Sequence, residues 1–387
     1  MPINKYTIIP SNFYLLTLVF AVVYLLGGEV VLYTKNFVFI FIKYVSVFLM
    51  SIQLGSAFFK YDKKWRLIIV LSLLLSLVVG LINGRYFELL ATCALVFGAK
   101  GQNYRNVLRY YFSISAFFCI SVILLCKLGV IRDNIAEPLT RINLLTGTDS
   151  IRHSFGYVWP TNLSTHVFFI LLSLWVYKKG CLNKWLCLIY IIISYLLLVY
   201  TDSRLGAGCI LLLPCFSMYI YIRDKMRWTF SRWNFFYVIW IPCVSVTMIY
   251  ITQNYDSSNG IWVILNTLLS GRLRIGHEAM SDYGTKLLGQ YYVQYGGQNA
   301  GDYYNFIDSS YIQLVIIYGI IYTVLLISAF VVVAYNSYKR KDFSLLLAIF
   351  VAGLSGAVAQ HFLQIYMNPI LLAMTSKHSD KGNTISI

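Results

Sequence analysis

The residues of this sequence best suited to chemistry are arginines and histidines in three short stretches. Each stretch also contains Gly, Pro or Ser, which favour shaped backbone. A guanidinium group binds phosphate or carboxylate bidentately and keeps its charge at physiological pH. A neighbouring imidazole can accept a proton near neutral pH. The pattern predicts an anion-binding site with a general base, formed by Arg152, His153, Arg204, Arg272, Arg274 and His277.

Four further residues are candidates for binding. Arg141 supplies another cation ahead of Arg152, and Tyr291 and Tyr292 follow a glycine, so that their rings could face a sugar. Asp308 lies at the expected start of a helix, where we expect its carboxylate to act mainly as an N-cap. Two plainer interpretations stay open. The arginines could pair with acids on a solvated surface, and the tyrosines could form an interfacial belt.

Several known catalytic motifs are absent. The sequence has no GxxxxGK[ST] loop for nucleoside triphosphates and no Asp-x-Asp pair that would hold a metal with a nucleotide-sugar. His277-Glu278 begins like a zinc-protease motif, but Ser281 stands where the second histidine is required. We therefore expect neither a metal site nor another cofactor.

The composition defines the elements that must position these residues. The chain has 387 residues, of which 59% are hydrophobic and only 12% charged, and its mean hydropathy is +0.69. Soluble domains carry about a quarter charged residues. A membrane-spanning helix needs about 20 apolar residues, and the sequence contains about a dozen such runs. We predict an all-α, polytopic integral membrane protein with about 11–12 transmembrane helices in a single domain, 1–387, and exclude a soluble enzyme.

Two long connections stand out between the predicted spans. They are residues 131–157 and 253–307, and long loops in a protein of short turns are expected to carry function. Residues 343–375 are too short for two full spans, so we expect a short hairpin or a helix broken near Asn368-Pro369. The spans are predicted near 11–33, 36–59, 65–83, 86–99, 108–130, 158–177, 183–201, 204–222, 233–252, 308–335, 343–360 and, weakly, 362–375.

The charge distribution predicts the orientation. With the N-terminus inside, the cytoplasmic segments contain twenty Lys and Arg and four acidic residues, whereas the outer segments contain nine of each. This is the positive-inside pattern, and it makes both long loops extracytoplasmic. The net charge of +16 therefore reflects topology and contact with anionic membrane lipid, and it does not indicate nucleic-acid binding.

Four ionisable residues fall within predicted spans and are functional candidates for that reason. They are Glu29, Lys43, Glu88 and Lys127. Glu29 could pair with Lys43, and Lys127, near a helix end, is expected to extend its ammonium group toward water.

Five short motifs, the last of them followed by Tyr318-Gly319-Ile320-Ile321, together resemble Wzy-type polysaccharide polymerases, the polymerases of O-antigen, capsule and exopolysaccharide, and more distantly the O-antigen ligases. Their order and their placement relative to the spans fit over roughly residues 130–325. One departure is that Trp159 stands where many family members have a histidine, and Thr161 separates Pro160 from Asn162. The motifs are Arg152-His153-Ser154-Phe155-Gly156-Tyr157 leading to Pro160, Ser203-Arg204, Ser270-Gly271-Arg272, Leu288-Gly289-Gln290, and Asp308-Ser309-Ser310-Tyr311 with Tyr318-Gly319-Ile320-Ile321 after it.

The resemblance implies a metal-independent glycosyltransferase at the outer face of the bacterial cytoplasmic membrane. Its substrates would be oligosaccharide repeat units on undecaprenyl diphosphate, and it suggests a flippase and a chain-length regulator as partners. Arg152 and Arg272 would bind diphosphate with support from Arg204 and Arg274, and His277 or His153 would take the proton of the acceptor hydroxyl. The alternatives are a flippase for the same lipid-linked oligosaccharide, a ligase-type transferase, and a non-enzymatic scaffold or channel.

Overall fold

The structure is a computed structural model that describes residues 11–31, 37–135, 151–227, 232–269, 271–295, 305–359 and 362–378. Arg141 lies outside these ranges. The helices are α1 Ser11–Gly27, α2 Phe37–Phe58, α3 Lys63–Asn83, α4 Tyr86–Gly98, α5 Tyr104–Lys127, α6 Pro160–Tyr177, α7 Lys184–Thr201, α8 Arg204–Lys225, α9 Phe236–Gln253, α10 Gly260–Leu268, α11 Arg272–Tyr283, α12 Ser310–Gln313, α13 Gly319–Lys339 and α14 Phe343–Val358.

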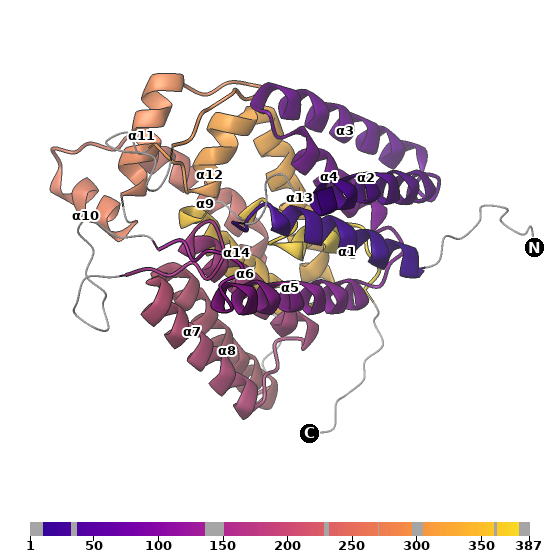
Figure 1. Cartoon of the computed structure of the whole chain (residues 1–387), viewed down its shortest axis with the longest axis horizontal. Helices are drawn as coiled ribbons and strands as arrows, with labels where there is room; N and C mark the ends of the chain where they lie inside the picture. The colour runs from indigo at the N-terminus through magenta and orange to yellow at the C-terminus, as the bar shows by residue number, and fades with distance from the viewer. Residues whose placement is uncertain are drawn as a thin grey trace, which may run out of the picture.

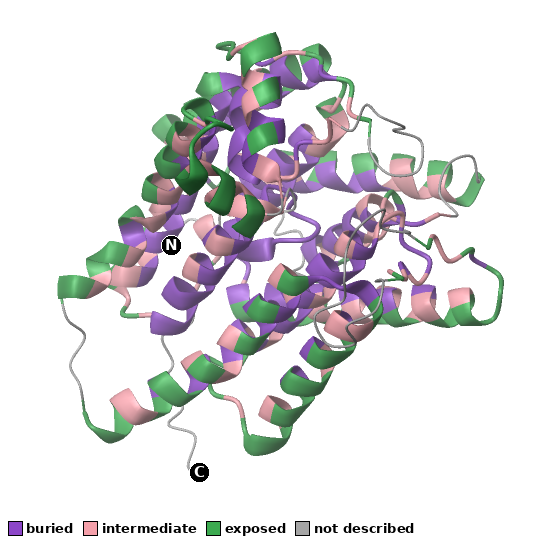
Figure 2. Cartoon of the chain, turned by 90° about the vertical axis from the view of Figure 1, so that its left-hand side faces the viewer, coloured by how far each residue is buried: buried purple, intermediate pink, exposed green. Residues whose placement is uncertain are grey.

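The fold class predicted from composition is confirmed. Seven of the described helices are long and apolar enough to cross a membrane, and three shorter apolar helices accompany them. Large hydrophobic side chains lie on the outside of the bundle, such as Phe37 at 79%, Phe117 at 70% and Val246 at 67% exposure. Figure 2 shows that exposed residues in general lie along the outward faces of the peripheral helices. Such a surface is stable in lipid and not in water, so the chain is an all-α polytopic membrane protein.

Consecutive helices pack as neighbours around two central ones. The pairs α1–α2, α3–α4, α5–α6 and α7–α8 each lie side by side, and α14 packs against α6, α8 and α9. In Figure 1, α6 and α14 lie near the middle, and α10 and α11 project at the left. We call this left-hand end, where α7, α9 and α14 end, the outer end, and the opposite one the inner end. The predicted loop 253–307 thus contains two helices, α10 and α11.

Side-chain caps are more frequent at helix starts of the inner end, although α9 there has none and α10 at the outer end is capped by Asn259. At the inner end, α3, α5, α7 and α14 begin after an Asp or Asn whose side chain accepts a backbone N–H: Asp62, Asn103, Asn183 and Asp342. Such caps satisfy amides that have no partner within the helix. The helices α4, α6, α8 and α11, which start at the outer end, have no side-chain cap. Some of their first amides have other acceptors, since Arg274 N donates to Asn266 Oδ1 and Asn162 N donates to Trp159 O, both at 3.1 Å.

The last described segment crosses the bundle without forming a spanning helix. Residues 362–378 run from the outer end of α14 back to the inner end, with one 3-10 turn at Pro369–Met374. There, the backbone N–H of Lys377 donates to Gln102 O at 2.6 Å, and the backbone carbonyl of Lys377 accepts from Tyr104 N at 2.9 Å. The prediction of a spanning helix at 362–375 is thus wrong, although this segment does run through the bundle from one end to the other. Irregular backbone is tolerated at this depth because protein buries it on all sides.

A second irregularity interrupts the helix at 310–339. A π-helical turn, Leu314–Tyr318, precedes Gly319, where the backbone has φ +84° and α13 begins. The loop at Gly289 packs directly on this break, with Gln290 N donating to Ile317 O at 3.1 Å. A Cβ atom at Gly289 or Gly319 would overlap the facing backbone, so only glycine fits both positions. Two of the motifs identified from sequence therefore form one structural unit.

The hydroxyl of Tyr111 holds the crossing segment. It is fully buried and donates to the Tyr366 carbonyl at 2.9 Å, with the Met367 carbonyl also in reach. Tyr111→Phe should leave these carbonyls unpaired in an apolar interior, at a cost of about 1–3 kcal/mol. We expect a lower melting temperature of the purified protein in detergent. Tyr110→Phe, at the exposed neighbouring position, is the control; equal melting of both variants would contradict the assigned role.

Candidate functional site

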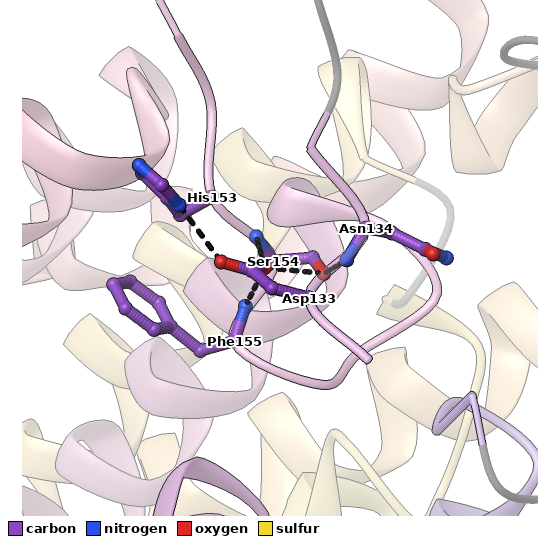
Figure 3. Close-up of polar contacts among 5 residues, drawn as sticks. All are labelled: Asp133, Asn134, His153, Ser154 and Phe155. Atoms are coloured by element: carbon purple, nitrogen blue, oxygen red, sulfur yellow. Dashed lines mark hydrogen bonds and ion pairs between the residues drawn. The ribbon is translucent and has the colours of Figure 1, made fainter. Parts of the chain in front are cut away.

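The carboxylate of Asp133 fixes the stretch that contains Arg152 and His153 (Figure 3). Its Oδ2 lies 2.7 Å from His153 Nδ1, and its Oδ1 accepts the backbone N–H groups of Ser154 and Phe155 at 2.9 and 2.8 Å. The Ser154 hydroxyl donates to the same oxygen at 3.2 Å. Partial burial would raise the pKa of the Asp133 carboxyl, but the hydrogen bonds from His153, Phe155 and Ser154 outweigh it and lower the pKa.

This arrangement defines what His153 can do. Because a carboxylate accepts at Nδ1, that nitrogen carries hydrogen and Nε2 is left as the acceptor, the form needed in a general base. The His153 side chain is 34% exposed. The adjacent Ser154 is fully buried and bonds to Asp133 rather than to the imidazole, so the three residues do not form a nucleophilic triad.

The backbone after His153 is held in an unusual conformation. Phe155 has φ +47° and Gly156 has φ +90°, and the Phe155 ring stacks on His153 at 5.5 Å between centroids. The Lys127 ammonium lies 4.9 Å from the centre of the same ring. A bulky residue at positive φ costs about 1–3 kcal/mol, and such strain persists only where neighbouring contacts enforce it. The contacts with Asp133 and His153 supply that enforcement.

Two predicted cations meet at the turn between α7 and α8. Arg152 Nε donates to Thr201 O at 2.9 Å, and His153 N donates to Tyr200 O at 2.8 Å. Arg204 Nε lies 3.4 Å from Asp202 Oδ1, and Arg204 is 40% exposed. Arg152 and Arg204, which are distant in sequence, therefore lie at one turn of the outer end, with His153 beside Arg152.

Arg272 occupies a second position, where it joins three elements. Its Nε donates to Val358 O at the end of α14 at 2.7 Å, its Nη1 to Leu269 O at 3.3 Å, and its Nη2 lies 3.2 Å from Asp308 Oδ2. The expected N-cap role of Asp308 is wrong. The N-cap residue of α12 is Ser309, which makes no side-chain cap, and the Asp308 carboxylate pairs with Arg272 instead. This ion pair anchors the first turn of α11.

The other polar residues of α11 differ in their surroundings. Arg274 pairs with Glu278 at 3.0 Å on the exposed face of the helix. His277 is partly buried, and its Nδ1 lies 3.1 Å from the Thr252 carbonyl, so this nitrogen donates and Nε2 accepts. Its position fits a general base, whereas Arg274 is a surface residue.

A groove of about 600 Å³ runs below His277 between α9, α11 and α13. Its lining is mostly aliphatic, and Val246 and Val324, at 67% and 59% exposure, lie on the outside of the bundle. The groove therefore opens sideways, toward lipid. Gln253, His277, Ser281 and Thr285 line its outer end, and the hydroxyl residues Ser245 and Thr323 line it elsewhere. An elongated apolar chain with a polar head matches this distribution.

The two candidate tyrosines have different environments. Tyr292 is 8% exposed, donates its hydroxyl to Asn305 O at 2.9 Å and packs edge-on against Tyr283. Tyr291 is 67% exposed, with its ring near Gly84. Only Tyr291 presents a face to a ligand, and Tyr292 shapes the loop.

The structure adds a buried polar network that sequence reasoning did not assemble. Glu29 accepts from Tyr366 Oη at 2.8 Å and from Asn162 Nδ2, and Arg85 donates to Tyr318 Oη at 3.1 Å and to Gln294 Oε1 at 3.3 Å. We call these six residues, together with Glu88 one turn after Arg85, the Glu29–Arg85 network. The suggested pair of Glu29 with Lys43 is wrong, because Glu29 has these partners and the Lys43 ammonium lies over the Phe87 ring.

Part of this network could have been found from sequence. Glu29 and Glu88 stood out as acids within apolar runs, and Tyr318 belongs to one of the motifs. Arg85 and Asp133 gave no local signal beyond their outer position. Among the described residues, no group of three His, Cys, Asp or Glu side chains has the arrangement of a metal site.

Comparison of the chain with protein families, with curated proteins and with solved structures found no match.

Asp133 gives a pH-dependent prediction. A carboxyl with a lowered pKa in the folded state stabilises that state above the ordinary carboxyl range and loses the effect as the pH falls through its folded pKa. Asp133→Asn should melt below the wild type at pH 7, and the difference should shrink toward pH 3. The control is Asp282→Asn at an exposed position. A difference that is constant with pH, or the same for both variants, would refute the role of the charge.

Proposed function

We propose that this protein is a glycosyltransferase that joins oligosaccharide repeat units carried on undecaprenyl diphosphate into a polysaccharide, at the outer face of the bacterial cytoplasmic membrane. The observation that carries the proposal is the lateral groove with His277 at its polar end, on the same short helix that Arg272 anchors. A substrate with a long apolar tail, an anionic head and a hydroxyl to deprotonate fits this combination.

The chemistry follows from the roles of these groups. The acceptor hydroxyl oxygen attacks the anomeric carbon of the donor glycan, whose bond to the diphosphate oxygen breaks. The electron pair of that bond stays on the diphosphate, and the proton of the hydroxyl passes to His277 Nε2. His153 is the alternative base, with its Nδ1 held by Asp133. The products are the lengthened lipid-linked glycan and undecaprenyl diphosphate.

Cations and amide dipoles at the outer end would stabilise the leaving diphosphate. Arg152 and Arg204 lie together at the turn before α8, and α8 packs against α14, whose outer end binds Arg272. The starts of α4, α6 and α8, whose N-cap residues make no side-chain cap, add positive partial charge at the same end. Fixed donors of this kind typically contribute several kcal/mol to a transition state in which charge develops. We assign Arg152 and Arg204 to the diphosphate and Arg272 to positioning α11.

A flippase for the same lipid-linked substrate is the second candidate. The Glu29–Arg85 network and the helix broken at Gly319 favour a flippase, because transporters use buried charges and discontinuous helices. A ligase-type transferase would use the same groups with a different acceptor. Analysis of the products distinguishes polymerisation, ligation and transport.

The first test is reconstitution of the purified protein with lipid-linked repeat units in liposomes. We expect longer lipid-linked glycans, and we expect His277→Ala to slow their formation about 100-fold or more. Arg152→Ala should also abolish polymer while the protein still inserts. Arg274→Ala on the same helix is the matched control and should act within a few-fold of the wild type, because an exposed pair contributes about 0–1 kcal/mol. Movement of monomer across the bilayer without lengthening would instead support the flippase.

The second test concerns the groove. Val324→Trp should fill it and block the lipid tail, raising KM for the lipid-linked substrate, because Val324 lines the groove. Ile321→Trp, on the same helix and also exposed, lies outside the lining and should leave KM unchanged. Equal kinetics of the two variants would remove the groove from the substrate path.

A further inference from the structure

A second cavity lies at the inner end, away from the site described above. It has a volume of about 450 Å³ and is bounded by the starts of α5 and α14, the ends of α6, α8 and α13, and His378. Five cationic side chains from four separate elements line it: Arg105, Lys179, Arg223, Arg340 and Lys341. The positive-inside rule accounts for basic residues on this side of the membrane, but it does not require that they converge on one cavity.

The two carboxylates in the lining are already engaged. Asp342 Oδ1 accepts from Leu345 N at 3.1 Å and from Ser344 Oγ at 2.8 Å, as the cap of α14. Asp224 accepts two hydrogen bonds from Arg223, at 3.0 and 2.7 Å. Among the described residues, no ion pair involves Lys179 or Lys341. The cavity therefore retains an excess of positive charge.

A buried hydroxyl provides an independent sign of a missing ligand. Tyr104 is 4% exposed and lines the cavity, and its hydroxyl has no hydrogen-bond partner among the described residues. Asp342 and Arg340 lie close enough to this hydroxyl to act on it electrostatically. A buried hydroxyl without a partner costs about 1–3 kcal/mol, and a ligand oxygen in the cavity would satisfy it.

Aromatic contacts hold two of the cations in place. The Arg105 guanidinium lies 4.8 Å from the centre of the Tyr177 ring, and that of Arg223 lies 4.5 Å from the centre of the Phe343 ring. Guanidinium groups fixed on aromatic faces are preorganised donors for phosphate oxygens. The flat, anchored arginines and the two lysines suit a group with several negatively charged oxygens.

We propose that this cavity binds a phosphate group, from either an anionic lipid head group or a soluble phosphorylated molecule. Basic pockets between helices on the cytoplasmic side of membrane proteins bind phospholipid head groups in this way. The site is independent of the proposed glycosyltransferase activity and lies at the opposite end of the bundle. A bound phosphate would join α5, the α6–α7 turn and the α13–α14 turn to the last described segment through His378.

The test uses the full chain in nanodiscs and two probes. Inorganic phosphate is titrated in discs of phosphatidylcholine alone, and retention of phosphatidylglycerol from mixed discs is measured by native mass spectrometry. The pocket variant is Lys179→Gln with Lys341→Gln, and the matched control is Lys63→Gln with Lys64→Gln, which removes the same charge at the inner end outside the cavity. Tyr104→Phe removes only the unpartnered hydroxyl and so should not destabilise the free protein.

We expect the pocket variant and Tyr104→Phe to bind phosphate about tenfold more weakly or worse, because each loses interactions with a charged group. The control variant should bind phosphate as the wild type does. Saturable phosphate binding in phosphatidylcholine discs would identify a soluble ligand, and selective retention of phosphatidylglycerol alone would identify a head group. Both outcomes support the site. Absence of both, or equal loss in the pocket variant and the control, would overturn it.

Discussion

The need to satisfy backbone hydrogen bonds away from water shapes this protein more than any single contact. Lipid offers no partner for a free N–H or C=O, so lipid-facing segments are helical and non-helical chain lies inside. The crossing segment 362–378 and the break at Gly319 both follow this rule, because the side chain of Tyr111 and the loop at Gly289 supply partners to the first and the second. The irregular centre is stable because neighbouring helices, such as α4, α5 and α13 around the crossing segment, bury it.

That irregular centre is what makes the outer end chemically capable. Regular helices alone would present caps and apolar faces there. Instead, the break at Gly319 places Tyr318 against Arg85, and the crossing segment places Tyr366 against Glu29. The strained turn at Phe155 orients His153 in a similar way, with Asp133 as the group that enforces it. Polar side chains at the outer end are therefore held by other polar side chains, which fixes their tautomers and directions.

The two ends of the bundle use charge differently. At the inner end, basic residues outnumber acids, and their side chains face the membrane surface or line the basic cavity. The helix starts of α5 and α14 there are capped by Asn103 and Asp342. At the outer end, cations and acids are balanced in number, and the arginines are fixed individually by carbonyls and carboxylates, as with Arg152 and Arg272. Topology explains the first pattern. The second is the one that the proposed transfer of a diphosphate-linked glycan uses.

The sequence by itself determined the membrane class, most of the helices and the position of the two outer segments, because apolar runs and charge bias are local properties of the chain. It also singled out Arg152, Arg272 and His277, which the structure places at the outer end. It could not decide partners. Asp308 was expected to cap a helix and instead pairs with Arg272, and Glu29 binds Tyr366 rather than Lys43. Residues 362–378 do not form a spanning helix, because α4, α5 and α13 bury this segment away from lipid. Such choices depend on contacts between segments that are far apart in the sequence, and only the tertiary structure fixes them.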